Sequence, residues 1–172
     1  MLKSWRRALV VLIGVGAILM ASKPAPADEE TMVTFKVLTP ELALELAQAT
    51  LADCRKRGYQ ATVAVVDRFG GLQVVLRDRF AGVHTPETAR RKAWTAVSFR
   101  TDTLSLEELT QAGKPASAIR FVDQALMVGG GVPVDAGGSM VAGVGVSGAP
   151  GGEADDACAR AGIEAIADKI AF

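Results

Sequence analysis

The chain has 172 residues, of which 49% are apolar and 22% charged, with 19 basic and 19 acidic side chains. This length fits one domain rather than two, and the apolar content is sufficient for a hydrophobic core. The balanced charge excludes the strongly basic proteins that follow a phosphate backbone, so we expect no nucleic acid as a partner.

The first 27 residues have the three-part layout of a secretory signal peptide. Three basic residues among the first seven precede an uncharged apolar stretch at 8–20, and small residues at positions 25 and 27 precede a cleavage point after Ala27. The apolar stretch is short for a membrane span of about 20 residues, which favours a cleaved signal over an uncleaved anchor. We therefore expect a periplasmic or secreted protein in which residues 28–172 form a single domain. This domain keeps 15 basic and 19 acidic residues, because the signal removes four of the 19 basic ones, and its net charge is −4.

A first helix is predicted after a short lead. Residues 32–38 are rich in β-forming side chains and indicate either a short strand or an arm. Thr39 is a suitable cap for a helix whose first position is Pro40, and Gly58 ends it. The buried stripe of this helix is predicted at Leu44, Ala47, Leu51 and Cys54.

Two strands at residues 61–67 and 72–78 are predicted to form a hairpin, since both are rich in β-branched side chains. The segment between them begins at Asp67 and contains two glycines, which is typical of a tight turn. Arg77 and Asp78 end the second strand and form either an ion pair or a clamp for a ligand.

Helices are predicted after the hairpin. Thr85 is followed by proline and glutamate, which predicts a helix capped by Thr85 that runs to about Phe99. Its inward positions are predicted at Ala89, Ala93, Ala96 and Val97, and its solvent-facing positions include Arg90, Arg91 and Lys92. A short helix is predicted from Leu106 with Ser105 as its cap, whereas residues 117–127 fit a helix and a strand equally well.

Two more strands and a last helix are predicted toward the end of the chain. Strands at 129–134 and 140–146 flank a glycine-rich turn, and the glycines of the second strand indicate close approach by a backbone, a ligand or a partner. Asp155 and Asp156 begin the last helix, where acidic side chains favour the positive end of the helix dipole. Hairpins and helices in separate blocks predict an α+β fold with an antiparallel sheet.

His84 is the only histidine of the chain and lies in a loop directly before a predicted helix. It is either a solvated or capping residue, or an imidazole ligand for haem iron or a metal ion. Multi-histidine zinc sites and covalent haem attachment through C-x-x-C-H are excluded. Tyr59, Met127 and Met140 are weaker candidates for iron, because such side chains usually pack in cores. We assign no catalytic residue, since no acid–base pair accompanies a nucleophile.

Cys54 and Cys158 are the two cysteines of the chain. Both lie on or beside apolar helical stripes, so they are either two small core residues or, in an oxidising compartment, a disulfide. The first interpretation is favoured, and the second is left open, because two cysteines define no disulfide framework.

Five motifs taken together resemble a known family, the GlcG/HbpS-type haem-binding proteins, which also resemble the C-terminal domain of PduO-type proteins. The motifs are VAVVDRFGGLQVVLRD at 63–78, TARRKAWTA at 88–96, GGVPV at 130–134, VAGVGVSGA at 141–149 and DDACARAG at 155–162. The resemblance runs from about Thr39 to Ile170. The sequence departs from the family's R-x-D-G-A pattern at residues 77–82, directly before His84.

The resemblance implies an antiparallel sheet of about five strands flanked by helices, non-covalent haem binding and homo-oligomers. We single out His84, Arg77 and Asp78 as the candidate haem contacts and His84 as the candidate iron ligand. An exported member of this family looks like a haem-handling protein or a redox-sensing accessory to a membrane sensor protein. The alternatives are a small-molecule enzyme of the haem-degrading type and an interaction module for a membrane sensor. We expect binding rather than strong catalysis.

Overall fold

The computed structural model describes residues 31–171, of which residues 34–171 belong to one folded unit. The predicted signal peptide, residues 1–27, lies outside the described residues. Residues 32–38 contain no strand, so the segment before the first helix is an arm. The end of this arm is held by one side-chain hydrogen bond, which Gln73 Nε2 donates to the Leu38 carbonyl (3.0 Å).

Four strands form one antiparallel sheet in the order β2-β1-β4-β3. The strands are β1 (Thr62–Asp67), β2 (Leu72–Arg77), β3 (Gly131–Ala136) and β4 (Ser139–Ser147). The α+β class and the antiparallel pairing are confirmed, whereas the sheet has four strands instead of about five. The difference is the arm, whose backbone is not paired with an edge strand.

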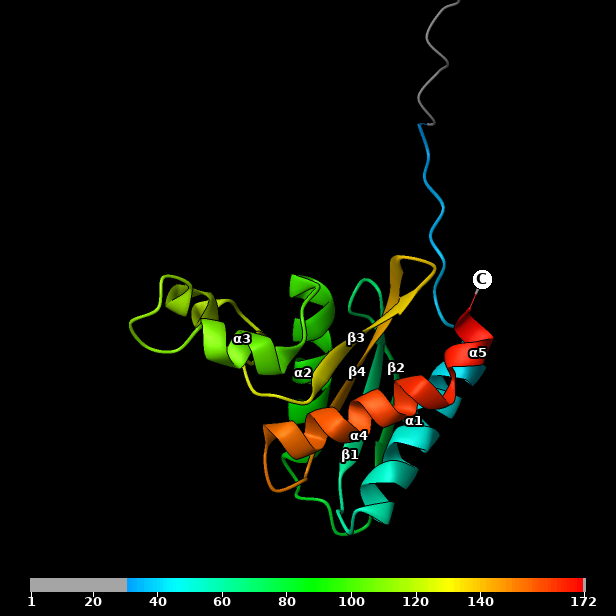
Figure 1. The fold of residues 1–172 in the computed structure, drawn as a ribbon, viewed down its shortest axis with the longest axis horizontal. Coiled ribbons are helices and arrows are strands. Elements are labelled where there is room, and N and C mark those ends of the chain that lie inside the picture. Colours follow the sequence, from blue (N-terminus) through cyan, green and yellow to red (C-terminus); the bar gives the residue numbers. More distant parts are fainter. Residues whose placement is uncertain (1–30, 172) are drawn as a thin grey trace, which may run out of the picture. The chain divides into compact units, whose positions relative to one another are not determined.

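Two long helices cover one face of the sheet (Figure 1). These are α1 (Pro40–Lys56) and α4 (Gly152–Ala165), and the short helix α5 (Ala167–Ile170) follows α4. The predicted start of α1 is confirmed, because Thr39 Oγ1 accepts a hydrogen bond from the Leu42 N–H (3.3 Å) and Pro40 is the first helical residue. The side chains of α1 and α4 enclose the main core together with valines from the strands, including Val63, Val65, Val144 and Val146.

A third long helix, α2 (Thr85–Phe99), packs on the opposite face of the sheet. The residues of β4 differ between the two faces of the sheet. Ala142, Val144 and Val146 fill the main core, while Gly143 and Gly145 alternate with them and lie on the opposite face. A Cβ atom at Gly145 would clash with the Ala89 carbonyl oxygen and lie 2.6 Å from the Ala93 nitrogen. The glycines of β4 therefore mark the close approach of another backbone, that of α2.

Two predicted helix caps differ from the structure. The residue before α2 is His84, not Thr85, and its side chain makes no capping bond. The Thr85 hydroxyl is buried, donates to the Gly82 carbonyl (2.7 Å) and lies 2.6 Å from the Thr62 hydroxyl, so it does not cap the helix. The next helix, α3 (Thr103–Leu109), is capped by Asp102, which accepts a hydrogen bond from the Ser105 N–H (2.8 Å). The ambiguous segment forms a short 3₁₀-helix, η1 (Ser117–Phe121).

Cys54 and Cys158 form a disulfide that joins α1 to α4. Both residues have no exposed surface, and their Cα atoms lie 5.4 Å apart. The favoured interpretation as two unlinked core residues is therefore wrong, and the alternative that was left open holds. Spacing along the chain could not decide this, because 104 residues separate the two cysteines.

The start of α1 and the end of α5 lie together. Leu38, Leu42 and Ile170 line a small, mainly apolar cavity of about 370 Å³ between them. Lys169 Nζ and Glu45 Oε1 are 2.5 Å apart and join the same two helices at the surface. In the part of the chain that the structure covers, no helix has the length and apolar character needed to cross a membrane.

Candidate functional site

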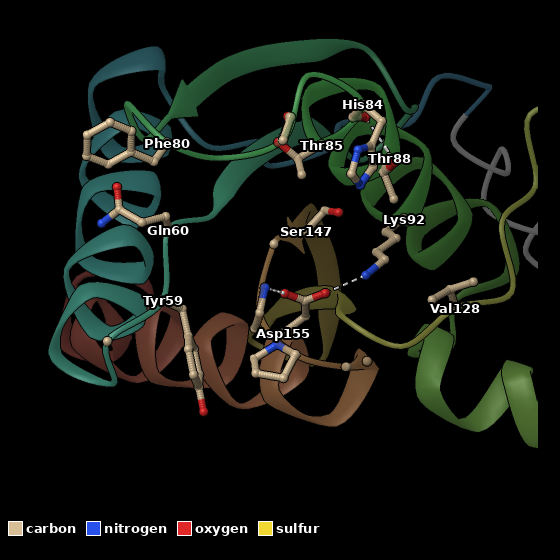
Figure 2. A pocket seen from close by; sticks show the side chains of 17 residues that line it. Tyr59, Gln60, Phe80, His84, Thr85, Thr88, Lys92, Val128, Ser147 and Asp155 are labelled. Atoms are coloured by element: carbon tan, nitrogen blue, oxygen red, sulfur yellow. Dashed lines mark hydrogen bonds and ion pairs between the residues drawn. The ribbon is translucent and has the colours of Figure 1, made fainter.

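A cavity of about 620 Å³ lies where β4 ends and where α2 and α4 begin. Three loops meet there: the turn after α1, the loop between β2 and α2, and the loop between β4 and α4 (Figure 2). The lining residues are Gly58, Tyr59, Gln60, Phe80, Gly82, His84, Thr85, Thr88, Lys92, Val128, Ser147, Gly148, Ala149, Pro150, Gly151, Gly152 and Asp155.

His84 lies at the rim of this cavity and is exposed. Its imidazole makes no hydrogen bond to any residue between 31 and 171, although its carbonyl accepts bonds from the Thr88 N–H and hydroxyl (3.1 and 3.0 Å). The ring lies over Gly82, where a Cβ atom would be 2.7 Å from the imidazole Cε1. The backbone of α2 is thus fixed at His84, while both ring nitrogens stay available to a ligand.

A buried ion pair forms the inner end of the cavity (Figure 2). Lys92 Nζ donates to Asp155 Oδ2 at 2.7 Å, and the two side chains are only 2% and 5% exposed. Asp155 Oδ1 accepts a hydrogen bond from the Ala149 N–H (3.0 Å). Burial raises the pKa of Asp155 above its ordinary value, and the attraction of Lys92 and the backbone N–H groups opposes this shift only in part.

Three cavity residues follow one another along a single face of α2. His84, Thr88 and Lys92 are spaced by four residues, which places them one above the other on a helix. With a rise of about 1.5 Å per residue, the backbone distance from His84 to Lys92 is about 12 Å. His84, directly before α2, therefore places an imidazole at the rim of the cavity, and Lys92 of α2 places an ammonium at its inner end.

Gln60, one of the lining residues, carries a buried acceptor that is unsatisfied within the described structure. Its Oε1 is buried and has no hydrogen-bond partner in the described structure. A buried amide oxygen without a partner is costly, and such atoms in native proteins often await a ligand or water.

Arg77 and Asp78, two of the predicted haem contacts, do not line the cavity. Asp78 is 3% exposed and accepts two hydrogen bonds from Arg55, at Nε (2.7 Å) and Nη2 (3.0 Å). The Arg55 guanidinium lowers the pKa of Asp78, since it stabilises the carboxylate. Arg77 donates from Nε and Nη2 to the Ala81 carbonyl (3.1 and 2.5 Å). Both residues hold the loop that leads to His84.

The weaker iron candidates are separated from one another. Tyr59 lines the cavity, Met127 is buried beside Leu106 and Ala125, and Met140 packs against a cluster that includes Val66. Within residues 31–171 no three histidine, cysteine or acidic side chains gather in a way that could hold a metal ion.

Lys92 and Asp155 were missed as site residues by the sequence reasoning. Lys92 was assigned to the solvent face, but it is three residues after Ala89 and four before Ala96, both of which are buried. This position on the buried stripe of the helix indicated that Lys92 is buried, but its charge led to the opposite assignment. Asp155 does begin α4 as predicted, but it is buried and paired, not a surface partner of the helix dipole.

An antiparallel sheet between two helical layers, with an open cavity that presents one imidazole and one buried ammonium, is typical of a small ligand-binding domain. The family model for haem-degrading proteins of the HbpS-like type matches residues 38–164. The chain therefore belongs to the HbpS-like family, as the motifs indicated.

Solved structures of related proteins share this fold. A double mutant of HbpS from Streptomyces reticuli is 38% identical, with a TM-score of 0.75 over 85% of this chain and 98% of that one. The haem complex of the PduO C-terminal domain is 28% identical, with a TM-score of 0.71 over 76% of this chain and 95% of that one.

Two curated proteins are similar in sequence. An uncharacterized 15.0 kDa protein from the dhaT-dhaS intergenic region of Citrobacter freundii is 30% identical over 113 residues, which is 64% of this chain and 80% of that protein. The corrinoid adenosyltransferase PduO of Salmonella typhimurium is 30% identical over 106 residues. The match covers 60% of this chain but only 32% of PduO.

Proposed function

We propose that this protein binds haem non-covalently in the cavity between α2 and α4, with His84 as a ligand to the iron. One observation carries the proposal: the only histidine of the chain holds an exposed imidazole, unbonded within the described structure, at the rim of a cavity of about 620 Å³. Membership of the HbpS-like family and the haem complex of the PduO C-terminal domain support it.

The residues of the cavity fit a haem group. Imidazole is a common axial ligand of haem iron, and the volume falls within the range of about 300–1,000 Å³ that small-molecule sites occupy. Phe80, which is 79% exposed, lies across the cavity from His84, and Val128 lines the side of Lys92 (Figure 2), so apolar surface is available to a porphyrin on both sides. When bound, haem would supply a redox-active iron.

In this proposal Arg77 and Asp78 affect haem binding indirectly, because they hold the loop that precedes His84. The bonds from Arg55 to Asp78 and from Arg77 to the Ala81 carbonyl fix residues 77–82 directly before His84. This is the stretch in which the sequence departs from the family pattern.

The test is a haemin titration of the protein, followed by absorbance in the Soret region, with His84→Ala beside it. We expect a saturable shift in the native protein and an affinity at least about tenfold lower in the variant, because the iron loses its ligand. Val83→Ala is the matched control, since Val83 is 88% exposed next to His84 but offers no ligand atom. Absence of a saturable shift at micromolar haemin would count decisively against the proposal.

We also propose export, self-association and action beside a membrane sensor protein. Export is supported by the layout of the first 27 residues, and mass analysis of the protein from a periplasmic fraction tests it. Self-association is supported by β2, an edge strand on which Leu72 and Val75 are 51% and 38% exposed, and light scattering tests it. The sensor follows from the resemblance alone, and a pulldown from membranes in both redox states tests it.

A further inference from the structure

The ammonium of Lys92 has hydrogen-bonding capacity that the protein does not use. A lysine ammonium has three donors, and within residues 31–171 it donates only to Asp155. The group is 2% exposed to solvent but lines the cavity. Gly130 lies beside the ammonium and has no side chain to crowd it. A Cβ atom at this position would lie 3.1 Å from Nζ. A desolvated cation with unfilled donors favours an anionic acceptor.

The carboxylate of Asp155, by contrast, is well satisfied. It accepts from Lys92 on one oxygen and from the Ala149 N–H on the other, and the Gly148 N–H also stabilises it. The pair is therefore asymmetric: the acid is enclosed by donors, whereas the ammonium still has donors that face the cavity.

The ends of two helices add to this bias. α4 begins at the cavity after Gly151, and α2 begins there after His84, and neither of these residues caps its helix with a side chain. Uncapped N–H groups and the positive ends of both helix dipoles consequently face the same space. The charged and titratable side chains that line it are Tyr59, His84, Lys92 and Asp155.

We propose that Lys92 binds a carboxylate of the ligand at the inner end of the cavity, about 12 Å of helix backbone from His84. Two unused donors match the two oxygens of a carboxylate. A doubly charged phosphate fits less well, because it would face the carboxylate of Asp155 with a single lysine to balance it. The identity of the carboxylate rests on the proposed function: in haem it is a propionate, and otherwise it belongs to a small free acid.

The decisive comparison is between haemin and haemin dimethyl ester, which lacks free carboxylates. We expect the native protein to bind haemin at least about tenfold more tightly than the ester, as a charged hydrogen bond contributes a factor of this size. In Lys92→Gln/Asp155→Asn, which removes both charges and retains hydrogen-bonding groups of similar size, the ratio should fall close to one. The Soret shift due to His84 should remain.

Glu87→Gln/Arg90→Gln is the matched control, since it neutralises an ion pair (2.7 Å) on the same helix whose residues do not line the cavity. Its preference for haemin over the ester should equal that of the native protein. A preference that persists unchanged in Lys92→Gln/Asp155→Asn overturns the inference and leaves haem binding intact. Unfolding midpoints without ligand identify a variant that has merely lost its fold, and a purely structural role for Lys92 would not alter the haemin-to-ester ratio.

If neither porphyrin binds, the proposed function fails, and benzoate tests the inference separately. Ligand-observed NMR should then show binding of benzoate to the native protein and to Glu87→Gln/Arg90→Gln, with loss of that signal in Lys92→Gln/Asp155→Asn. Equal signals in all three proteins, or none in the native one, overturn the inference.

Discussion

Lys92 Nζ lies 2.7 Å from Asp155 Oδ2, although 63 residues separate the two positions in the sequence. The pair connects the middle of α2 to the first turn of α4 at the inner end of the cavity. If the proposed site is correct, a change in either charge alters both the stability of the fold and the binding of the ligand.

Removal of one partner should destabilise the fold in a pH-dependent way. Lys92→Met leaves Asp155 buried without its cation, and we expect a loss of about 3 kcal/mol at neutral pH. Burial already raises the pKa of Asp155 above 3.8, and loss of Lys92 raises it further. A carboxyl group whose pKa is higher in the folded state binds more protons there, so stability falls as the pH rises from 3.8 through the folded-state pKa.

Urea unfolding across this pH range measures the effect. Lys92→Gln/Asp155→Asn is the control, because it should lose less stability and should lack this pH dependence. Tyr59 and His84, the other titratable residues of the cavity, are present in both variants. A loss in Lys92→Met that is the same at every pH would show that Asp155 does not take up the proton.

The direction of the His84 ring depends on the absence of a side chain at Gly82. In Gly82→Ala the new Cβ atom would lie 2.7 Å from the imidazole Cε1, so the ring must rotate away. The ring is the free end of a flexible side chain, and we expect a stability change below about 0.5 kcal/mol. Haemin affinity should nevertheless fall, and the Soret maximum should move. Wild-type spectra with Gly82→Ala would mean that the ring orientation seen in the structure is not needed for binding.

The contact between α2 and β4 should be much less tolerant. Gly145→Ala forces a Cβ atom against the Ala89 carbonyl and the Ala93 nitrogen, which are backbone atoms that cannot rotate away. We expect a loss of about 2–3 kcal/mol, measured by chemical unfolding. In Gly151→Ala nothing lies within 4 Å of the new Cβ atom, and the loss should be less than about 1 kcal/mol. Equal losses in the two variants would contradict this account of β4.

The disulfide should be a large single contribution to stability. Cys54 and Cys158 close a loop with a sequence separation of 104, for which the chain-entropy model gives about 4.7 kcal/mol. Reduction, or Cys54→Ala/Cys158→Ala, should lower the unfolding midpoint by a corresponding amount, since both remove the same cross-link. Identical unfolding curves with and without a thiol reductant would show that the two thiols are not linked in solution.

Local signals in the sequence were sufficient for most of the secondary structure. The hairpin turn was predicted from Asp67 and two glycines, and Asp67 Oδ1 does accept hydrogen bonds from the Phe69 and Gly71 N–H groups (2.8 and 2.9 Å). The start of α1 was predicted correctly for the same reason, because a cap and the helix that it begins are neighbours in the chain.

Long-range contacts were beyond the reach of such signals. The cavity forms only when the loop before α2 meets the loop before α4, and no local pattern specifies that meeting. Lys92 is the clearest example of this limit of local signals. Its charge predicted a solvent-exposed position, and its burial is explained only by its partner from α4. His84 could be singled out because it is unique in composition, and its position at the rim came from the fold.

The meeting of α1 and α5 affects how a domain of this fold can be joined to another protein. Leu38, shortly before α1, and Ile170, the last residue of α5, line the same small cavity, so the first helix of the fold begins where the last one ends. A domain with adjacent ends can be appended to another protein, or inserted into one of its loops, without stretching either connection. The same geometry would allow a domain of this fold to be joined to other domains. PduO is consistent with this, since the region that matches this chain is 32% of that relative.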